Sequence, residues 1–186
     1  MSHASEQSSR SVAEEFLDLA IDLLTRSAFE LFETYGCTIE RGSRSPEAKV
    51  HLDLTLGAAI GFTGEYVRGI LAIAVDDELA KRLNPVLPDP DSCGGDDWIG
   101  ELANQLLGRL KNKLLRFNIE VAITTPIIVH GSHLKIGTVH RKATRLAFSS
   151  GASQADVWLD AEVDPALAIS EEDAPDVQAE GAMVLF

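Results

Sequence analysis

The chain has few cysteines and no long hydrophobic run. Cys37 and Cys93 are its two cysteines among 186 residues, too few to staple a secreted domain, so reduced thiols are expected. No apolar run approaches the roughly 20 residues that a transmembrane helix needs. Residues 1–10 are polar and lack the apolar core of a secretory signal. These absences predict a cytoplasmic protein that neither spans nor contacts a membrane.

Basic residues are also scarce, at 16 against 29 acidic ones, which gives a formal net charge of −13. Such a charge repels phosphates and argues against a nucleic-acid partner. The cations concentrate in residues 101–145, whereas residues 151–186 carry nine acidic residues and no basic one. A basic middle could meet an acidic partner, or both segments could be solvated faces; the sequence leaves both open. The basic residues of the middle are Arg109, Lys111, Lys113, Arg116, Lys135, Arg141, Lys142 and Arg145.

Helical spacing of apolar residues marks residues 11–35 as a long helix. Ser11 is a suitable N-cap, and Glu14 three residues later completes a capping-box pattern. Gly36 is placed to end this helix. A second long helix is predicted over residues 98–117.

The remaining patterns predict strands joined by short turns. Alternating polar and apolar residues mark residues 49–59 as a half-buried strand, and residues 60–64 and 69–75 read as an antiparallel hairpin. Asp76 or Asp77 caps a short helix that runs through Ala80 to Leu83, and the Pro-rich residues 84–95 form a loop. Further extended segments are expected at 37–47 (in part), 119–125, 127–129, 134–139, 144–149 and 155–162.

Because strands follow strands directly, the pattern favours an α+β fold with an antiparallel sheet and two long helices. A helix followed by hairpins occurs at residues 11–75 and again at 98–162, which permits a pseudo-twofold arrangement. We expect a disordered N-terminus over 1–10, one domain over 11–163, and an acidic, flexible tail over 164–186.

The second helix carries the most informative pattern. Its apolar residues form one broad arc, while Glu101 and Asn104 stand at i and i+3 on the opposite arc. Asp97 reads as an N-cap. Asn104 is a poor helix former, and Gly108 costs about 1 kcal/mol relative to Ala, so this face suggests close approach by another molecule.

These residues resemble the signature of the CheC/CheX/FliY chemotaxis phosphatases, and the CheX branch most closely. The likeness extends over about residues 28–159. It rests on Asp97-x3-Glu101-x2-Asn104, Gly108, Pro126, Ile99-Gly100-Glu101-Leu102, Ile123-Thr124-x-Pro126, Val129-x-Gly131, Ile60-Gly61-Phe62-Thr63-Gly64 and Gly69-Ile70-Leu71.

The resemblance implies dephosphorylation of a phosphorylated CheY-type response regulator. Glu101 would pair with a lysine of the regulator, and Asn104 would hold the attacking water in line with the aspartyl phosphate. Asp97, Gly108 and Lys111 would contact the partner. Mg²⁺ would belong to the regulator, so no metal or other cofactor is expected on this chain. The CheX branch also implies a homodimer joined through its sheets.

Some family members carry two such motifs, but the first helix has Ser11-x3-Glu15 followed by Asp18 where the pattern has Asn. One active site is therefore expected. The alternative is a non-catalytic CheX-like module that binds a response regulator or another signalling protein. His130, His133 and His140 have no carboxylate or thiol at metal-ligand spacing, so no metal site is predicted there.

Overall fold

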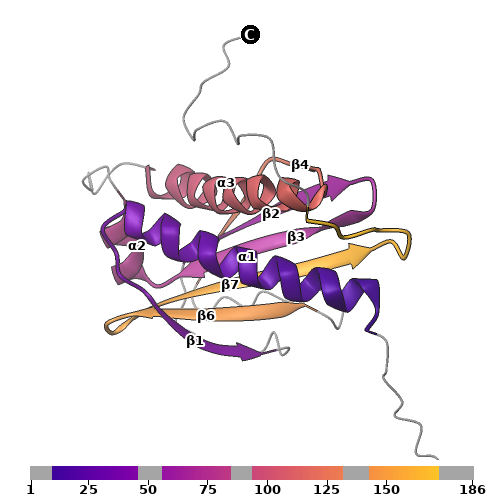
Figure 1. The fold of residues 1–186 in the computed structure, drawn as a ribbon. Coiled ribbons are helices and arrows are strands. Elements are labelled where there is room, and N and C mark those ends of the chain that lie inside the picture. Colours follow the sequence, from indigo (N-terminus) through magenta and orange to yellow (C-terminus); the bar gives the residue numbers. More distant parts are fainter. Residues whose placement is uncertain (1–9, 46–55, 85–93, 132–142, 172–186) are drawn as a thin grey trace, which may run out of the picture.

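Two long helices, α1 and α3, lie side by side across one face of an antiparallel sheet (Figure 1). The computed structural model describes residues 10–45, 56–84, 94–131 and 143–171. The strand order is β1-β6-β7-β3-β2-β4, and β5 also pairs with β2, which makes a seven-stranded sheet. The predicted α+β class with an antiparallel sheet is confirmed.

Helix α1 covers Val12–Thr34 and begins as the sequence predicts. Ser11 is its N-cap, and the reciprocal hydrogen bonds of a capping box join Ser11 and Glu14. Gly36 follows the helix with φ of +69°, a left-handed conformation that glycine adopts without strain.

The middle of the sheet contains the β2–β3 hairpin, which the sequence also predicts. Strand β2 pairs with β3 from Leu56↔Val75 to Thr63↔Arg68. The strands that the sequence placed at 134–139 and at the beginning of 49–59 lie outside the described residues. The strand bounds are Glu40–Ser45 (β1), Leu56–Gly64 (β2), Val67–Val75 (β3), Val121–Ile123 (β4), Ile127–His130 (β5), Thr144–Ser150 (β6) and Ser153–Val163 (β7).

Helix α2 (Asp77–Leu83) has Asp76 as its N-cap. Helix α3 covers Gly94–Leu114 and continues as a 3-10 turn over Leu115–Phe117. The prediction that α3 begins at Trp98 with Asp97 as its N-cap is wrong. Glycine is a poor helix former, so the Gly94-Gly95 pair suggested a loop, yet both residues belong to the helix. None of the helices in the described ranges has the length and apolar composition to cross a bilayer.

The hydrophobic core lies between the two long helices and the sheet. Phe16 and Leu24 of α1 and Leu102 and Leu106 of α3 are at most 1% exposed. Burying such side chains stabilises the fold by about 1.5–3 kcal/mol each. Leu167, beyond the last strand, is also buried in this core. The inward face of α3 is therefore fixed, and the rest of its surface is presented outward.

Candidate functional site

The predicted site residues Glu101 and Asn104 lie on the outer surface of α3. Leu102, Ala103 and Leu106 are fully buried against the sheet, so the helix cannot rotate without exposing them. Glu101 is exposed and Asn104 is half-buried at its side. Both side chains are therefore held on a rigid element by the packing of their neighbours.

The two side chains differ in how they are held. The carboxylate of Glu101 accepts a hydrogen bond of 3.0 Å from Nε2 of Gln105, one turn further along α3. Oε1 of Gln105 in turn accepts a hydrogen bond of 3.1 Å from the hydroxyl of Tyr35, at the end of α1. Asn104 makes no hydrogen bond through its side chain to the residues that the structure describes, so its carboxamide can bind another molecule.

Aromatic packing supports this chain of hydrogen bonds. The ring of Tyr35 packs edge-to-face against Trp98, with centroids 5.9 Å apart and planes at 87°. Such a pair contributes about 0.5–1.5 kcal/mol beyond its buried area. Gln105 and Tyr35 were not identified from the sequence; a Gln at i+4 from Glu101 is the signal that was available.

Gly100 of α3 lies close to Pro126, which is distant in sequence but belongs to the same motif as Glu101 and Asn104. A Cβ at Gly100 would lie 3.4 Å from Cγ of Pro126 and 3.5 Å from Cδ1 of Ile128. The helix therefore approaches β5 and the turn before it closely at the residue that precedes Glu101. This contact fixes the height of the Glu101 turn above the sheet.

Gly108 and Lys111 continue the same surface towards the end of α3. A Cβ at Gly108 would meet no atom within 4 Å, so the space above this residue is open. Lys111 is half-buried and lines a surface hollow of about 620 Å³ between α3 and the β2–β3 hairpin.

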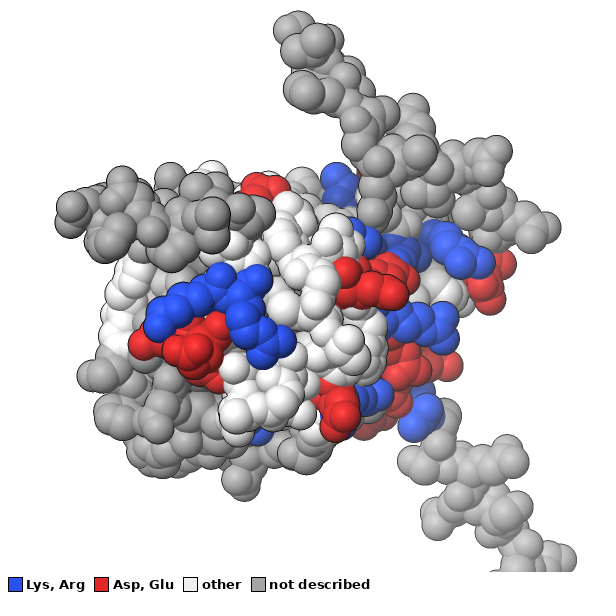
Figure 2. All heavy atoms as spheres, turned by 90° about the vertical axis from the view of Figure 1, so that its left-hand side faces the viewer, with Lys and Arg blue, Asp and Glu red and all other residues white. Residues whose placement is uncertain are grey.

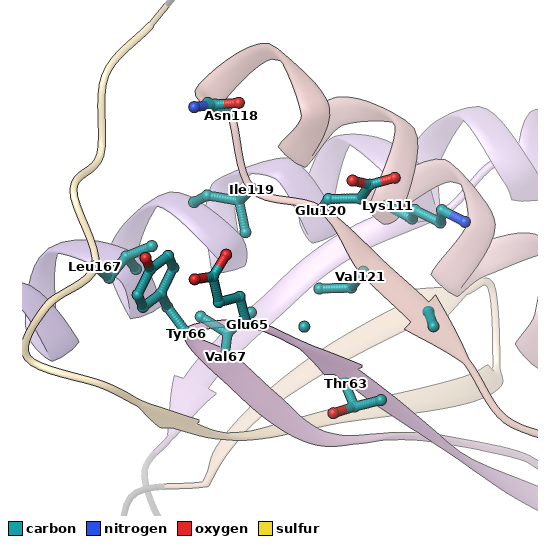
Figure 3. Close-up of a pocket in the computed structure, with 12 residues that line it drawn as sticks. Thr63, Glu65, Tyr66, Val67, Lys111, Asn118, Ile119, Glu120, Val121 and Leu167 are labelled. Carbon is teal, nitrogen blue, oxygen red and sulfur yellow. The ribbon is translucent and has the colours of Figure 1, made fainter.

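Figure 3 shows this hollow, with Lys111 and Glu120 on its α3 side and Glu65 and Tyr66 together on the hairpin side. A side-chain hydrogen bond to Glu65 raises the pKa of the Tyr66 phenol, which keeps it protonated. The hollow thus continues the open surface of α3 with a charged, polar lining.

Asp97, the fifth predicted site residue, is the fourth residue of α3. It precedes Glu101 by one turn of the helix. Its assignment as a partner contact stays a prediction.

The basic residues of the middle segment are mostly paired with acidic residues of this chain. Glu30 of α1 accepts from Lys113 at 2.6 Å and lies 3.8 Å from Arg109. Arg116 pairs with Glu171, and Arg145 with the buried Asp156. Figure 2 shows the same mixing at one end of the molecule, where red and blue side chains touch. Among the described basic residues of this segment, Lys111 has no ion pair.

Within the described part of the chain, no three His, Cys, Asp or Glu side chains are grouped as metal ligands would be. His130 is exposed at the end of β5, and His133 and His140 lie outside the described residues.

Comparison with known proteins identifies the family. The sequence profile described as "Chemotaxis phosphatase CheX" matches residues 56–149, which include β2, β3, α3 and most of β6. No curated protein matches the chain by sequence.

Solved structures share the fold. Chemotaxis protein CheX from Vibrio vulnificus is 19% identical, with a TM-score of 0.70 over 77% of this chain and 99% of that one. A CheC-like protein from Shewanella sp. PV-4 is 23% identical, with a TM-score of 0.69 over 77% and 97%. The CheX–CheY–BeF3–Mg²⁺ complex from Borrelia burgdorferi matches with 19% identity and a TM-score of 0.65 over 77% and 97%. The profile match across half of the sequence, on a fold shared with these structures, means that this chain belongs to the CheX family of chemotaxis phosphatases.

Proposed function

We propose that this protein hydrolyses the aspartyl phosphate of a CheY-type response regulator, using Glu101 and Asn104 of α3. The proposal rests on the exposed carboxylate of Glu101, which lies beside the carboxamide of Asn104. That carboxamide has no hydrogen-bond partner among the described residues, and the inner face of the helix that carries both side chains is fully packed. The CheX-family profile supports the phosphatase class, and the Borrelia complex is a CheX protein bound to CheY.

Glu101 docks the regulator by pairing with a lysine in its phosphorylation site. The hydrogen bond from Gln105 engages one carboxylate oxygen, Oε1, and the side chain remains exposed to a visiting cation. A carboxylate that is already oriented loses less side-chain entropy on binding than a free one. Gln105 and Tyr35 are therefore positioning residues for this contact.

Asn104 orients the attacking water. Its carbonyl oxygen accepts from the water and its amide group donates, so the side chain can align the water without being ionised. The water oxygen forms a bond to phosphorus while the bond between phosphorus and the aspartyl oxygen breaks. The regulator regains its aspartate and inorganic phosphate leaves with the water-derived oxygen. Alignment of this kind supplies a large part of the acceleration in phosphoryl transfer.

Gly108, Lys111 and Asp97 belong to the surrounding contact surface. The open space above Gly108 lets the regulator's backbone approach α3, and Lys111 offers a cation that no acidic residue of the described chain pairs with. Mg²⁺ sits on the regulator in this proposal, and the chain itself holds no cofactor. We place the reaction in the cytoplasm.

We also propose that the protein is a homodimer. Ile127 and Val129 of β5 are 69% and 38% exposed. Their register opposite Ala59 and Gly57 places both on the sheet face away from the helices. Large exposed apolar side chains on one strand are suited to an interface with a second copy. Sedimentation of the wild type and of an Ile127→Lys variant tests this, because the variant is expected to be monomeric.

Inorganic phosphate release from a phosphorylated regulator tests the phosphatase. We expect the wild type to accelerate release and the Glu101→Ala/Asn104→Ala double variant to leave it at the spontaneous rate, with both proteins folded by circular dichroism. A wild type that binds the BeF3-activated regulator but does not accelerate release would instead assign the non-catalytic binding module.

A further inference from the structure

A second hollow, of about 380 Å³, lies on the opposite side of the sheet from α1 and α3, beside the Ile127 and Val129 patch of the proposed dimer interface. Gly61, Ile70 and Asp160 form one row across β2, β3 and β7, and all three line it. The next row contains Leu71 and Leu159, which are buried in the core beneath the helices. Because side chains alternate along a strand, Asp160 points away from the helices.

Asp160 is a buried acid that has no partner among the described residues. It is 6% exposed, and its Oδ1 is buried without a hydrogen bond. Asp160 forms no hydrogen bond or ion pair with any residue of the described chain. Burying a carboxylate without a compensating donor is unfavourable by several kcal/mol, so the site is poised for a ligand that donates.

The donors of Arg145, Arg68 and Trp158 on this face form no hydrogen bond with Asp160. Arg145 makes a bidentate pair with Asp156, with both distances 2.8 Å. Arg68 pairs in the same way with Glu162, at 3.0 and 2.8 Å. Nε1 of Trp158, two residues before Asp160 on the same face, is buried without a hydrogen bond of its own.

The comparison with Asp156 shows what Asp160 lacks. Both acids are buried on the same face of β7, on either side of Trp158. Asp156 has the guanidinium of Arg145, on β6, within 2.8 Å. Asp160 has no such partner among the described residues and lines the hollow on the β3 side of β7. A cation from outside the chain would give Asp160 the partner that Arg145 gives Asp156.

We propose that this hollow binds an alkylammonium group, with one N–H donated to Asp160. Ile70 is 52% exposed and offers an apolar wall for the alkyl part. The Thr63 hydroxyl at the rim can accept another N–H group. The volume lies within the usual range for small-ligand sites. A divalent metal is disfavoured because the described residues contain no group of three ligating side chains.

Titration of the full chain with n-butylamine at neutral pH, followed by backbone-amide chemical shifts, tests the proposal without any response regulator. We expect saturable shifts around Gly61, Ile70 and Asp160. Asp160→Asn is expected to weaken binding about tenfold or more, since a charge-assisted hydrogen bond is lost. Asp22→Asn, which removes an exposed carboxylate of α1, is the matched control and is expected to bind as the wild type does.

Two further ligands test whether the positive charge is required and whether the ammonium group comes from a lysine side chain or a free amine. n-Butanol has a similar shape without the charge, and equal shifts with butanol and butylamine would overturn the proposal. Absence of saturable shifts, or undiminished binding by Asp160→Asn, would also overturn it. A lysine blocked at both backbone ends provides the second arm: tighter binding of this probe than of butylamine assigns a lysine side chain, and the reverse assigns a free amine. The outcome is independent of phosphate release.

Discussion

Helices α1 and α3 lie on the same face of the sheet and place different chemistry at matching steps of their sequences. When Glu15 is aligned with Glu101, Asp18 matches Asn104 and Asp22 matches Gly108. The remaining matches are Ser11 with Asp97, Leu19 with Gln105, and Thr25 with Lys111. The first helix therefore has a carboxylate where α3 has an amide, and a second carboxylate where α3 has open space.

Matching residues of the two helices also differ in their side-chain contacts. Asp18 is 3.2 Å from Arg10 in an ion pair, whereas Asn104 makes no side-chain hydrogen bond to the described residues. Thr25 is buried and donates to the carbonyl of Ile21, whereas Lys111 reaches a surface hollow. The acids on α1 would repel a phosphoryl group, whereas α3 combines Glu101, the proposed docking acid, with neutral and basic groups. The proposed function therefore assigns the active site to α3 alone, although both helices lie on the same face of the sheet.

Giving position 104 of α3 the aspartate that α1 has at position 18 is expected to have the largest effect on phosphate release. Asn104→Asp keeps the shape of the side chain but adds a negative charge that, in the proposed complex, would face the phosphoryl oxygens. We expect phosphate release from the regulator to fall about 100-fold or more. Circular dichroism should be unchanged because this half-exposed side chain has no hydrogen-bond partner among the described residues. Full activity of the Asp variant would remove the basis for calling α1 inactive.

The second comparison concerns Gly108 of α3 and Asp22, the matching residue of α1. Gly108→Asp reproduces Asp22 of α1 and is expected to weaken binding of the BeF3-activated regulator about tenfold through repulsion and bulk. Gly108→Ala is the control: its Cβ meets no atom within 4 Å, so it should stabilise the helix by about 1 kcal/mol and raise Tm by about 2–4 °C. Equal affinity of the Asp variant and the wild type would mean that the regulator does not approach this residue.

Removing the hydroxyl of Tyr35 tests the support that α1 gives to α3. Tyr35→Phe retains the edge-to-face contact with Trp98 but releases Gln105, so the carboxylate of Glu101 is less well held. We expect affinity for the activated regulator to fall about 2- to 5-fold, the effect of one neutral hydrogen bond. The release rate at saturating regulator should stay the same. A loss confined to that rate would instead place Tyr35 in the chemical step.

Making α1 resemble α3 is expected to have no effect. In an Asn104→Ala background, Asp18→Asn/Asp22→Gly places an amide and open space on the first helix. The position on α1 that matches Lys111 is the buried Thr25, and the position that matches Gln105 is Leu19, which cannot donate to the carboxylate of Glu15. Phosphate release should therefore stay at the spontaneous rate. Restored release would show that two substitutions suffice to create a second site.

The local parts of the fold could be predicted from sequence, because local chemistry decides them. The capping box of Ser11 and Glu14 and the β2–β3 hairpin follow from residues close in the chain. The beginning of α3 could not, since two glycines with weak helix propensity are helical there.

In the site, too, the features set by local sequence could be predicted, and those set by packing could not. The spacing of Glu101 and Asn104 predicted their shared outer face, because helical periodicity sets it. The hydrogen bond between Tyr35 and Gln105 joins residues 70 apart in sequence and depends on how two helices pack. The different surroundings of Asp156 and Asp160 depend on strand register in the same way, although the two acids occupy similar places in the sequence of β7.

The most direct test measures binding and hydrolysis separately in Asn104→Ala. Affinity is measured with the BeF3-activated regulator, and hydrolysis by single-turnover phosphate release from the phosphorylated regulator at saturating protein. We expect affinity within about threefold of the wild type, with phosphate release at the regulator's spontaneous rate. Release at the wild-type rate in this variant would contradict the claim that the carboxamide on α3 aligns the attacking water.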